Sequence, residues 1–172
     1  SELANYKAKL KGLRGLPGPL RTVLEQLPAG THPMNVLRTG ASALGCLLPE
    51  KEEHDSARAP GVADHLVASF GSMLCYWYHW SPNGQRIHVE TEHDSIGGHF
   101  LHLLHRRAPS ASWVRAMHTS LNLYAEHEFN SSTFTARVIA GTGSDIYSSI
   151  TGAIGALRGP KHGGANEVAL VI

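Results

Sequence analysis

Apolar residues recur at three- and four-residue steps along most of this chain. In the first segment they stand at Leu3, Tyr6, Leu10 and Leu13. This spacing places them on one face of a helix. The same period continues through most later segments, so the pattern predicts a mainly helical chain.

Prolines, glycines and capping residues divide the chain into further helices. Ser131 or Ser132 is expected to cap one of them, and Ser144 or Asp145 the next, because short polar side chains favour helix N-termini. After the first segment, we expect helices over residues 20–27, 33–47, 62–80, 99–107, 112–129, 133–140 and 146–157.

No segment alternates convincingly between apolar and polar residues, and the nearest case, 87–93, is short. We therefore predict an all-α architecture with short loops and little or no sheet. The polar segment 50–60 is expected to be a surface loop, and 81–84 a turn. Residues 1–10 and 165–172 have helical spacing but lack helix-ending signals at the chain ends, which predicts a part of a longer chain.

The composition fits one soluble globular domain. The chain has 172 residues, of which 17% are charged and 42% hydrophobic. Its formal net charge of +1 gives no indication of a nucleic-acid or membrane partner. The longest apolar run, 66–78, is too short to span a bilayer. Cys46 and Cys75 form no CxxC motif and no signal peptide is recognisable, so we expect a reduced, cytoplasmic protein.

Two motifs fit a structural role better than a role in binding or catalysis. His99, His102 and His105 follow at steps of three, a poor spacing for zinc, and we expect partly buried imidazoles that hydrogen-bond to neighbours. A histidine-rich metal-binding protein is therefore the weakest functional class. Residues 141–145, GTGSD, resemble a phosphate loop but lack its further glycine and lysine, which favours a turn between helices.

Two other histidines are candidates for chemistry. His127 lies in YAEHEFNSSTF at a predicted helix junction, where it either faces a cleft or has a structural role. His162 lies in GPKHGG, just before a predicted helix. The positive end of a helix disfavours imidazolium, so a neutral His162 could donate a hydrogen bond to an oxyanion among glycines. The alternative is that this segment is only a turn between helices.

Together, YAEHEFNSSTF and RGPKHGGANE resemble the citrate synthase family. The likeness extends over essentially the whole chain. RTGASALG, SIGGHFLHLLH and ARVIAGTGSDIYSSITGAIGALRGPKHGG are most similar to the bacterial branch that makes 2-methylcitrate during propionate breakdown. The resemblance implies part of the multi-helical large domain over residues 1–172, without the family's N-terminal region and C-terminal small domain.

The resemblance also implies an acyl-CoA:oxaloacetate C-acyltransferase that condenses propionyl-CoA with oxaloacetate and uses no metal or other cofactor. His162 would be the catalytic histidine at the thioester oxygen. His127 and Asn130 would bind oxaloacetate, and Gly163 and Gly164 would line the substrate pocket. A homodimer is expected through the helices near 33–47 and 62–80.

The family's aspartate base, its third histidine and its carboxylate-binding arginines have no counterpart in these residues. We therefore expect the 172-residue polypeptide alone to be inactive. Two alternatives stay open at this point. One is a citrate synthase that uses acetyl-CoA, which differs by one methylene, and the other is a non-catalytic helical fragment that dimerises.

Overall fold

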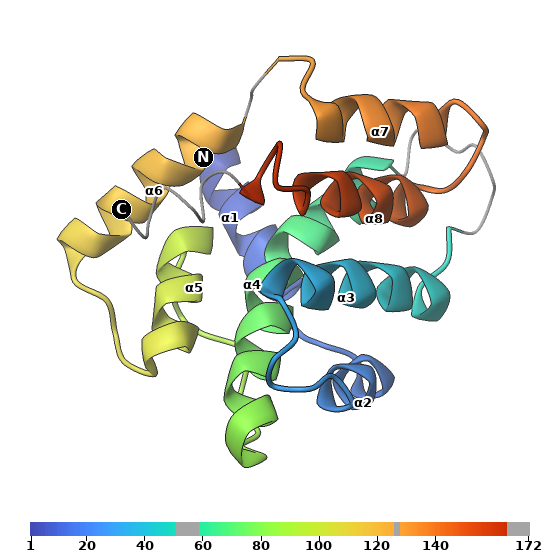
Figure 1. Cartoon of the computed structure of the whole chain (residues 1–172). Coiled ribbons are helices and arrows are strands. Elements are labelled where there is room, and N and C mark those ends of the chain that lie inside the picture. Colours follow the sequence, from blue (N-terminus) through green and yellow to red (C-terminus); the bar gives the residue numbers. More distant parts are fainter. Residues whose placement is uncertain (51–58, 126–127, 165–172) are drawn as a thin grey trace.

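The prediction of an all-α chain is confirmed. The computed structural model describes residues 1–50, 59–125 and 128–164, and within these ranges it has eight helices and no strand (Figure 1). The helices are α1 (Glu2–Gly12), α2 (Gly18–Glu25), α3 (Pro33–Leu47), α4 (Ala59–Asn83), α5 (Ile96–His105), α6 (Ala111–Ala125), α7 (Ser131–Ala140) and α8 (Ile146–Leu157).

The helices are arranged around α4, the longest of those described. On one side of α4, α8 packs between α3 and α7 (Figure 1). On the other side, α5 contacts α4, and α6 contacts α5. The core lies mainly where α2, α3, α4 and α8 meet, and it includes Leu20, Leu24, Val36, Leu44 and Met73. Helices α6 and α7 have no buried residue, so they form the outside of this arrangement.

A glycine lies in the contact between α7 and α8. A Cβ at Gly152 would collide with the Cδ1 of Ile139, so a larger residue there would require the Ile139 side chain to move. The contact matters for function because α7 and α8 form two walls of the candidate site described below.

The helix caps partly differ from those expected. Helix α7 begins after Asn130, whose Oδ1 accepts a hydrogen bond from the Thr133 N–H at 3.0 Å. The prediction of a cap at Ser131 or Ser132 is therefore wrong, because asparagine caps as well as serine does and comes first in the chain. At α8 the cap is Asp145, which accepts from the Ser148 N–H at 2.8 Å. Residues 141–145 thus form the predicted turn between helices.

Helix α4 extends beyond both predicted ends. It includes Ala59 and Pro60 at its start, where proline suits the first turn. At the other end it continues through Pro82 to Asn83, so the predicted turn over 81–84 is wrong. Gly84 ends the helix with a φ of 65°, and its N–H bonds to the Trp80 carbonyl at 2.6 Å. A left-handed residue, rather than proline, therefore ends this helix.

His99 belongs to a buried polar cluster, not to a metal site. Its Nε2 lies 3.1 Å from Ser72 Oγ and its Nδ1 lies 3.0 Å from Thr91 Oγ1, so both ring nitrogens have partners. Nearby, the fully buried Arg14 donates to the backbone carbonyls of Thr91 and His93. In the described part of the chain, no three His, Cys, Asp or Glu side chains are grouped to hold a metal ion.

We expect acid to destabilise the fold through His99. Burial lowers the pKa of His99 from 6.5 to about 3, so the folded chain keeps the ring neutral. The stabilisation is complete above pH 6.5 and is lost as the pH falls from 6.5 towards about 3. The loss is about 1.4 kcal/mol per pH unit. Burial also lowers the pKa of His65 and His93, so these two residues also make the fold less stable as the pH falls.

Urea unfolding at about pH 7 and about pH 5 measures this effect, which should be about 2 kcal/mol for His99 alone. His99→Gln should be less stable at neutral pH but should show a much flatter pH dependence. His88→Gln, at an exposed position, should keep the wild-type dependence. Equal pH dependences for His99→Gln and the wild type would contradict the assignment.

Candidate functional site

A cavity of about 570 Å³ lies between the end of α6, the two helices α7 and α8, and the loop that follows α8. We call it the His162 cavity. It brings together three of the predicted site residues, His162, Asn130 and Gly163. The lining residues are Leu123, Tyr124, Asn130, Ser132, Thr133, Ala136, Ile150, Ala153, Leu157, His162 and Gly163.

The loop over 158–164 holds His162 at the cavity. The backbone N–H groups of His162 and Gly164 both bond to the Gly159 carbonyl, at 3.0 and 3.2 Å. This pair of bonds closes a tight turn directly after α8. Gly164, the last described residue, is helical. The helix expected after that residue lies outside the described residues.

Gly163 is required by the close approach of this loop to α8. A Cβ at Gly163 would collide with the Leu157 carbonyl oxygen, which is backbone and cannot rotate away. Gly163 borders the cavity, whereas Gly164 is not among its lining residues. A Cβ at Gly164 would lie 3.2 Å from the Gly159 carbonyl oxygen, so Gly164 also lies in a tightly packed part of the loop.

Ser132 orients the ring of His162. Its Oγ lies 2.8 Å from His162 Nε2 and comes from the first turn of α7. When the Ser132 hydroxyl donates this bond, neutral His162 carries its proton on Nδ1 and can donate it to a third group. The sequence pattern predicts Ser132 only as a possible cap and does not indicate this role. The available signal was its position two residues after Asn130, on the same helix terminus.

The side-chain oxygen of Asn130 caps a helix, while its side-chain nitrogen can donate to a ligand. Its Oδ1 caps α7, and so the side-chain NH₂ remains as its hydrogen-bonding group. The N-terminus of α7 adds a positive partial charge at this position. Asn130 can therefore donate to an anionic or carbonyl oxygen without losing its cap. The other predicted ligand of oxaloacetate, His127, lies outside the described residues.

The described lining of the His162 cavity contains hydrogen-bond donors but no Asp, Glu, Lys or Arg. His162 and Asn130 can stabilise negative charge that develops on a substrate oxygen. These residues offer no carboxylate base for a carbon acid and no cationic side chain for a dicarboxylate. The apolar lining from Leu123, Ile150 and Leu157 suits a small organic substrate.

Comparisons with known proteins show the family of this chain. The family model described as "Citrate synthase, C-terminal domain" matches residues 1–172. The chain belongs to this family. It is 59% identical over 170 residues to 2-methylcitrate synthase of Shewanella oneidensis, covering 99% of this chain and 44% of the relative. It is 36% identical to citrate synthase of Deinococcus radiodurans, covering 99% of this chain and 45% of that protein.

A solved structure supports the same fold. It is the ternary complex of carboxymethyl coenzyme A and oxaloacetate with citrate synthase from Thermoplasma acidophilum. The TM-score is 0.86 and the identity 27%, and the match covers 97% of this chain and 43% of that one. The present chain therefore spans less than half the length of the relatives that it matches.

Proposed function

We propose that this chain is part of a 2-methylcitrate synthase, an acyl-CoA:oxaloacetate C-acyltransferase that condenses propionyl-CoA with oxaloacetate and water. The observation that carries this proposal is the 59% identity to a 2-methylcitrate synthase, against 36% to the citrate synthase compared above. The His162 cavity supports it, because its donors match the oxyanion chemistry that condensation requires.

In the proposed reaction, a base removes a proton from the carbon next to the propionyl thioester. His162 Nδ1–H donates to the thioester oxygen as negative charge builds up there, while Ser132 holds the opposite ring nitrogen. The resulting enol carbon attacks the ketone carbon of oxaloacetate. Water then cleaves the thioester, which releases CoA and 2-methylcitrate.

The rest of the site is proposed to come from residues beyond these 172. They would supply the carboxylate base, a further histidine and arginines for the oxaloacetate carboxylates, and residues 1–172 would belong to the large helical domain. His127 is proposed to bind oxaloacetate beside Asn130. No metal or other cofactor is proposed. The 172-residue polypeptide alone should release no CoA above background, which a thiol-release assay measures.

Asn130→Asp should separate the two roles of Asn130. Aspartate keeps the oxygen that caps α7, but it loses the NH₂ and brings a negative charge towards a dianionic substrate. The variant is measured in a polypeptide that contains these residues and has the full length of the relatives. There, we expect the KM for oxaloacetate to rise roughly tenfold to a hundredfold. Thermal stability should change little.

Asn130→Ala is the matched comparison, since it removes the cap as well and should cost about 1 kcal/mol of stability. If Asn130→Asp left the KM for oxaloacetate at the wild-type value, the role of Asn130 in binding would be wrong.

The acyl preference is tested by kcat/KM for propionyl-CoA and acetyl-CoA under the same conditions. We expect propionyl-CoA to be preferred by about 10- to 100-fold, because one methylene in a fitted apolar pocket contributes about 1–3 kcal/mol. A preference for acetyl-CoA would instead favour the alternative, a citrate synthase. Saturable oxaloacetate binding would count against the second alternative, a non-catalytic helical fragment.

We also propose that the protein is cytoplasmic and that it forms a homodimer through the helices near 33–47 and 62–80. No helix in the described ranges has both the length and the apolar character needed to cross a membrane. Helices α3 and α4 each bury one face in the core and leave apolar side chains exposed on another, among them Leu47, Val67 and Tyr78. These exposed groups support a second copy as partner. Sedimentation at micromolar concentration tests this assembly.

A further inference from the structure

Thr133 carries a hydroxyl group in the His162 cavity to which the proposed reaction assigns no role. The residue lies in the first turn of α7, directly after Ser132, and it lines the cavity. Its side chain is partly buried. Within residues 1–50, 59–125 and 128–164, no group hydrogen-bonds to its Oγ1. The hydroxyl is therefore available to a molecule in the cavity.

The position of Thr133 in the helix explains why its hydroxyl has no backbone acceptor. A serine or threonine inside a helix commonly donates to the carbonyl four residues earlier. Thr135 does so, since its Oγ1 donates to the Ser131 carbonyl at 2.8 Å. For Thr133 the corresponding carbonyl belongs to Phe129, which precedes Asn130, the N-cap of α7. This carbonyl is not part of the helix, so the helix gives the Thr133 hydroxyl no acceptor of this kind.

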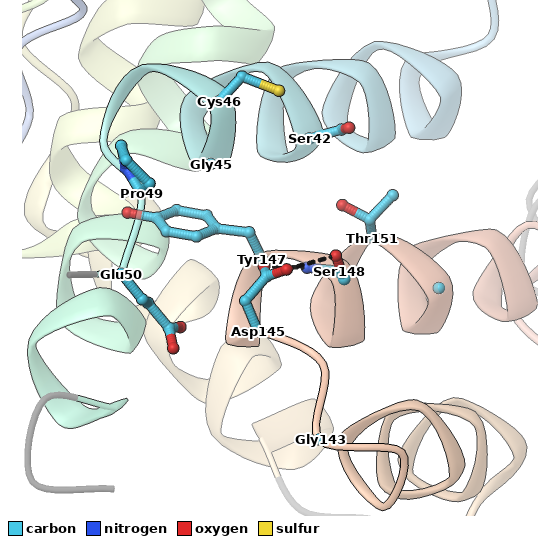
Figure 2. A pocket seen from close by; sticks show the side chains of 11 residues that line it. Ser42, Gly45, Cys46, Pro49, Glu50, Gly143, Asp145, Tyr147, Ser148 and Thr151 are labelled. Carbon is cyan, nitrogen blue, oxygen red and sulfur yellow. Dashed lines mark hydrogen bonds between the residues drawn. The ribbon is translucent and has the colours of Figure 1, made fainter. Parts of the chain in front are cut away.

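The equivalent position in α8 has a different arrangement. Ser148 follows its N-cap, Asp145, at the same spacing as Thr133 follows Asn130. Ser148 uses both oxygens of Asp145, because its N–H donates to Oδ1 at 2.8 Å and its Oγ donates to Oδ2 at 2.7 Å (Figure 2). Asn130 has a single side-chain oxygen, and the Thr133 N–H already donates to it. An asparagine cap therefore leaves the Thr133 hydroxyl free.

Thr133 and Asn130 present two hydrogen-bond donors from one helical turn. The 3.0 Å bond from the Thr133 N–H to Asn130 Oδ1 fixes the two residues relative to each other, and both line the cavity. Oxaloacetate carries two carboxylates, and each of their oxygens accepts hydrogen bonds. Since the described lining has no Lys or Arg, this wall can bind a carboxylate only through neutral donors.

The apolar part of the cavity lies beyond these two groups. Ala136 follows Thr133 by one turn of α7, and Ile150 and Ala153 line the cavity from α8. A carboxylate against these apolar side chains would be unfavourable, because burying an ion without a polar partner is costly. The carboxylate is therefore expected at the first turn of α7, where Asn130 and Thr133 lie.

We propose that Thr133 is a substrate-binding residue, whose hydroxyl donates a hydrogen bond to the same carboxylate of oxaloacetate as the Asn130 side-chain nitrogen. This inference rests on the proposed function. The carboxylate keeps its charge throughout the condensation, so the hydrogen bond is equally strong in the bound substrate and in the transition state. Its loss therefore raises the KM for oxaloacetate and leaves kcat nearly unchanged.

The test is steady-state kinetics of Thr133→Val in a polypeptide that contains these residues and has the full length of the relatives. Valine keeps the branched shape of threonine and lacks the hydroxyl. We expect the KM for oxaloacetate to rise about tenfold and kcat to stay within about twofold of the wild type. Thr133→Ser keeps the hydroxyl and should stay within about threefold of the wild-type KM.

Thr135→Val is the matched control. It removes a hydroxyl from the same helix, at a residue that is not among those lining the cavity, and should keep the wild-type KM. Circular dichroism and thermal melting compare the folding of the variants. If valine at position 133 perturbs the fold, Thr133→Ala repeats the test with a residue that favours helices.

The results separate this inference from the proposed function. If the wild type releases no CoA from propionyl-CoA and oxaloacetate, the proposed function and this inference both fail. If the wild type is active but Thr133→Val keeps the wild-type KM for oxaloacetate, only the role of Thr133 is wrong. The role is also wrong if Thr133→Ser raises this KM as much as Thr133→Val does, or if kcat falls while the KM stays constant.

Discussion

Replacing His162 with alanine should lower kcat for CoA release by about 10²- to 10³-fold in a chain of the relatives' length. In the proposed reaction, His162 supplies the hydrogen bond to the thioester oxygen when its negative charge develops. Among the described lining residues, no charged group could replace it. Because the charge appears mainly in the transition state, kcat should fall much more than the KM for propionyl-CoA rises.

Ser132→Ala is the informative companion of His162→Ala. Ser132 acts through His162, so its loss should leave the ring in place but less well oriented. We expect a loss of about tenfold in kcat and a shift in the pH profile, with unchanged thermal stability. A His162→Ala variant that kept kcat within about tenfold of the wild type would contradict the assigned role. An unchanged pH profile in Ser132→Ala would contradict the orienting hydrogen bond.

Gly163→Ala should be the second most damaging substitution, although it adds only a methyl group. The new Cβ would collide with the Leu157 carbonyl oxygen, so the loop must move away from the end of α8. Since His162 is the neighbouring residue, its ring would be displaced with the loop. A displacement of about 1 Å can cost roughly a hundredfold in rate, which is the loss in kcat that we expect.

Gly61→Ala is the matched control for this prediction. A Cβ at Gly61 would meet nothing within 4 Å, and the residue lies inside α4. This variant should keep full activity and gain up to about 1 kcal/mol of stability, because alanine favours a helix more than glycine does. Circular dichroism would show whether Gly163→Ala keeps its helices. Wild-type activity in Gly163→Ala would show that the loop tolerates the shift and that its packing does not position His162.

The helices were predictable because their signals are local. The spacing of apolar residues and the positions of the prolines predicted α3 over 33–47. Asp145, the N-cap of α8, was one of the two residues predicted for that position. The cap of α7 was missed because Asn130 and the two serines after it are chemically almost equivalent as caps. The end of α4 was missed because the SPNG pattern over 81–84 is typical of a turn, whereas the helix includes Pro82 and ends at Gly84.

The site was predictable only in part. The motifs indicated His162 and Asn130 one by one, but no local pattern shows that a residue 30 positions before His162 hydrogen-bonds to its ring. The same limit applies to the buried cluster of His99, whose partners Ser72 and Thr91 are separated in the chain and meet only after α4 and α5 have packed. Such contacts depend on tertiary structure, which periodicity does not encode.

The most direct test of the proposed site is a crystal structure of a chain of the relatives' length that contains these residues, with oxaloacetate and carboxymethyl coenzyme A bound. We expect oxaloacetate in the His162 cavity, with the Asn130 side-chain nitrogen within hydrogen-bond distance of one of its oxygens. The His162 Nδ1 should face the thioether arm of the CoA analogue, while Ser132 remains on Nε2. Ligands bound elsewhere, or a His162 ring turned away from both of them, would contradict the assignment.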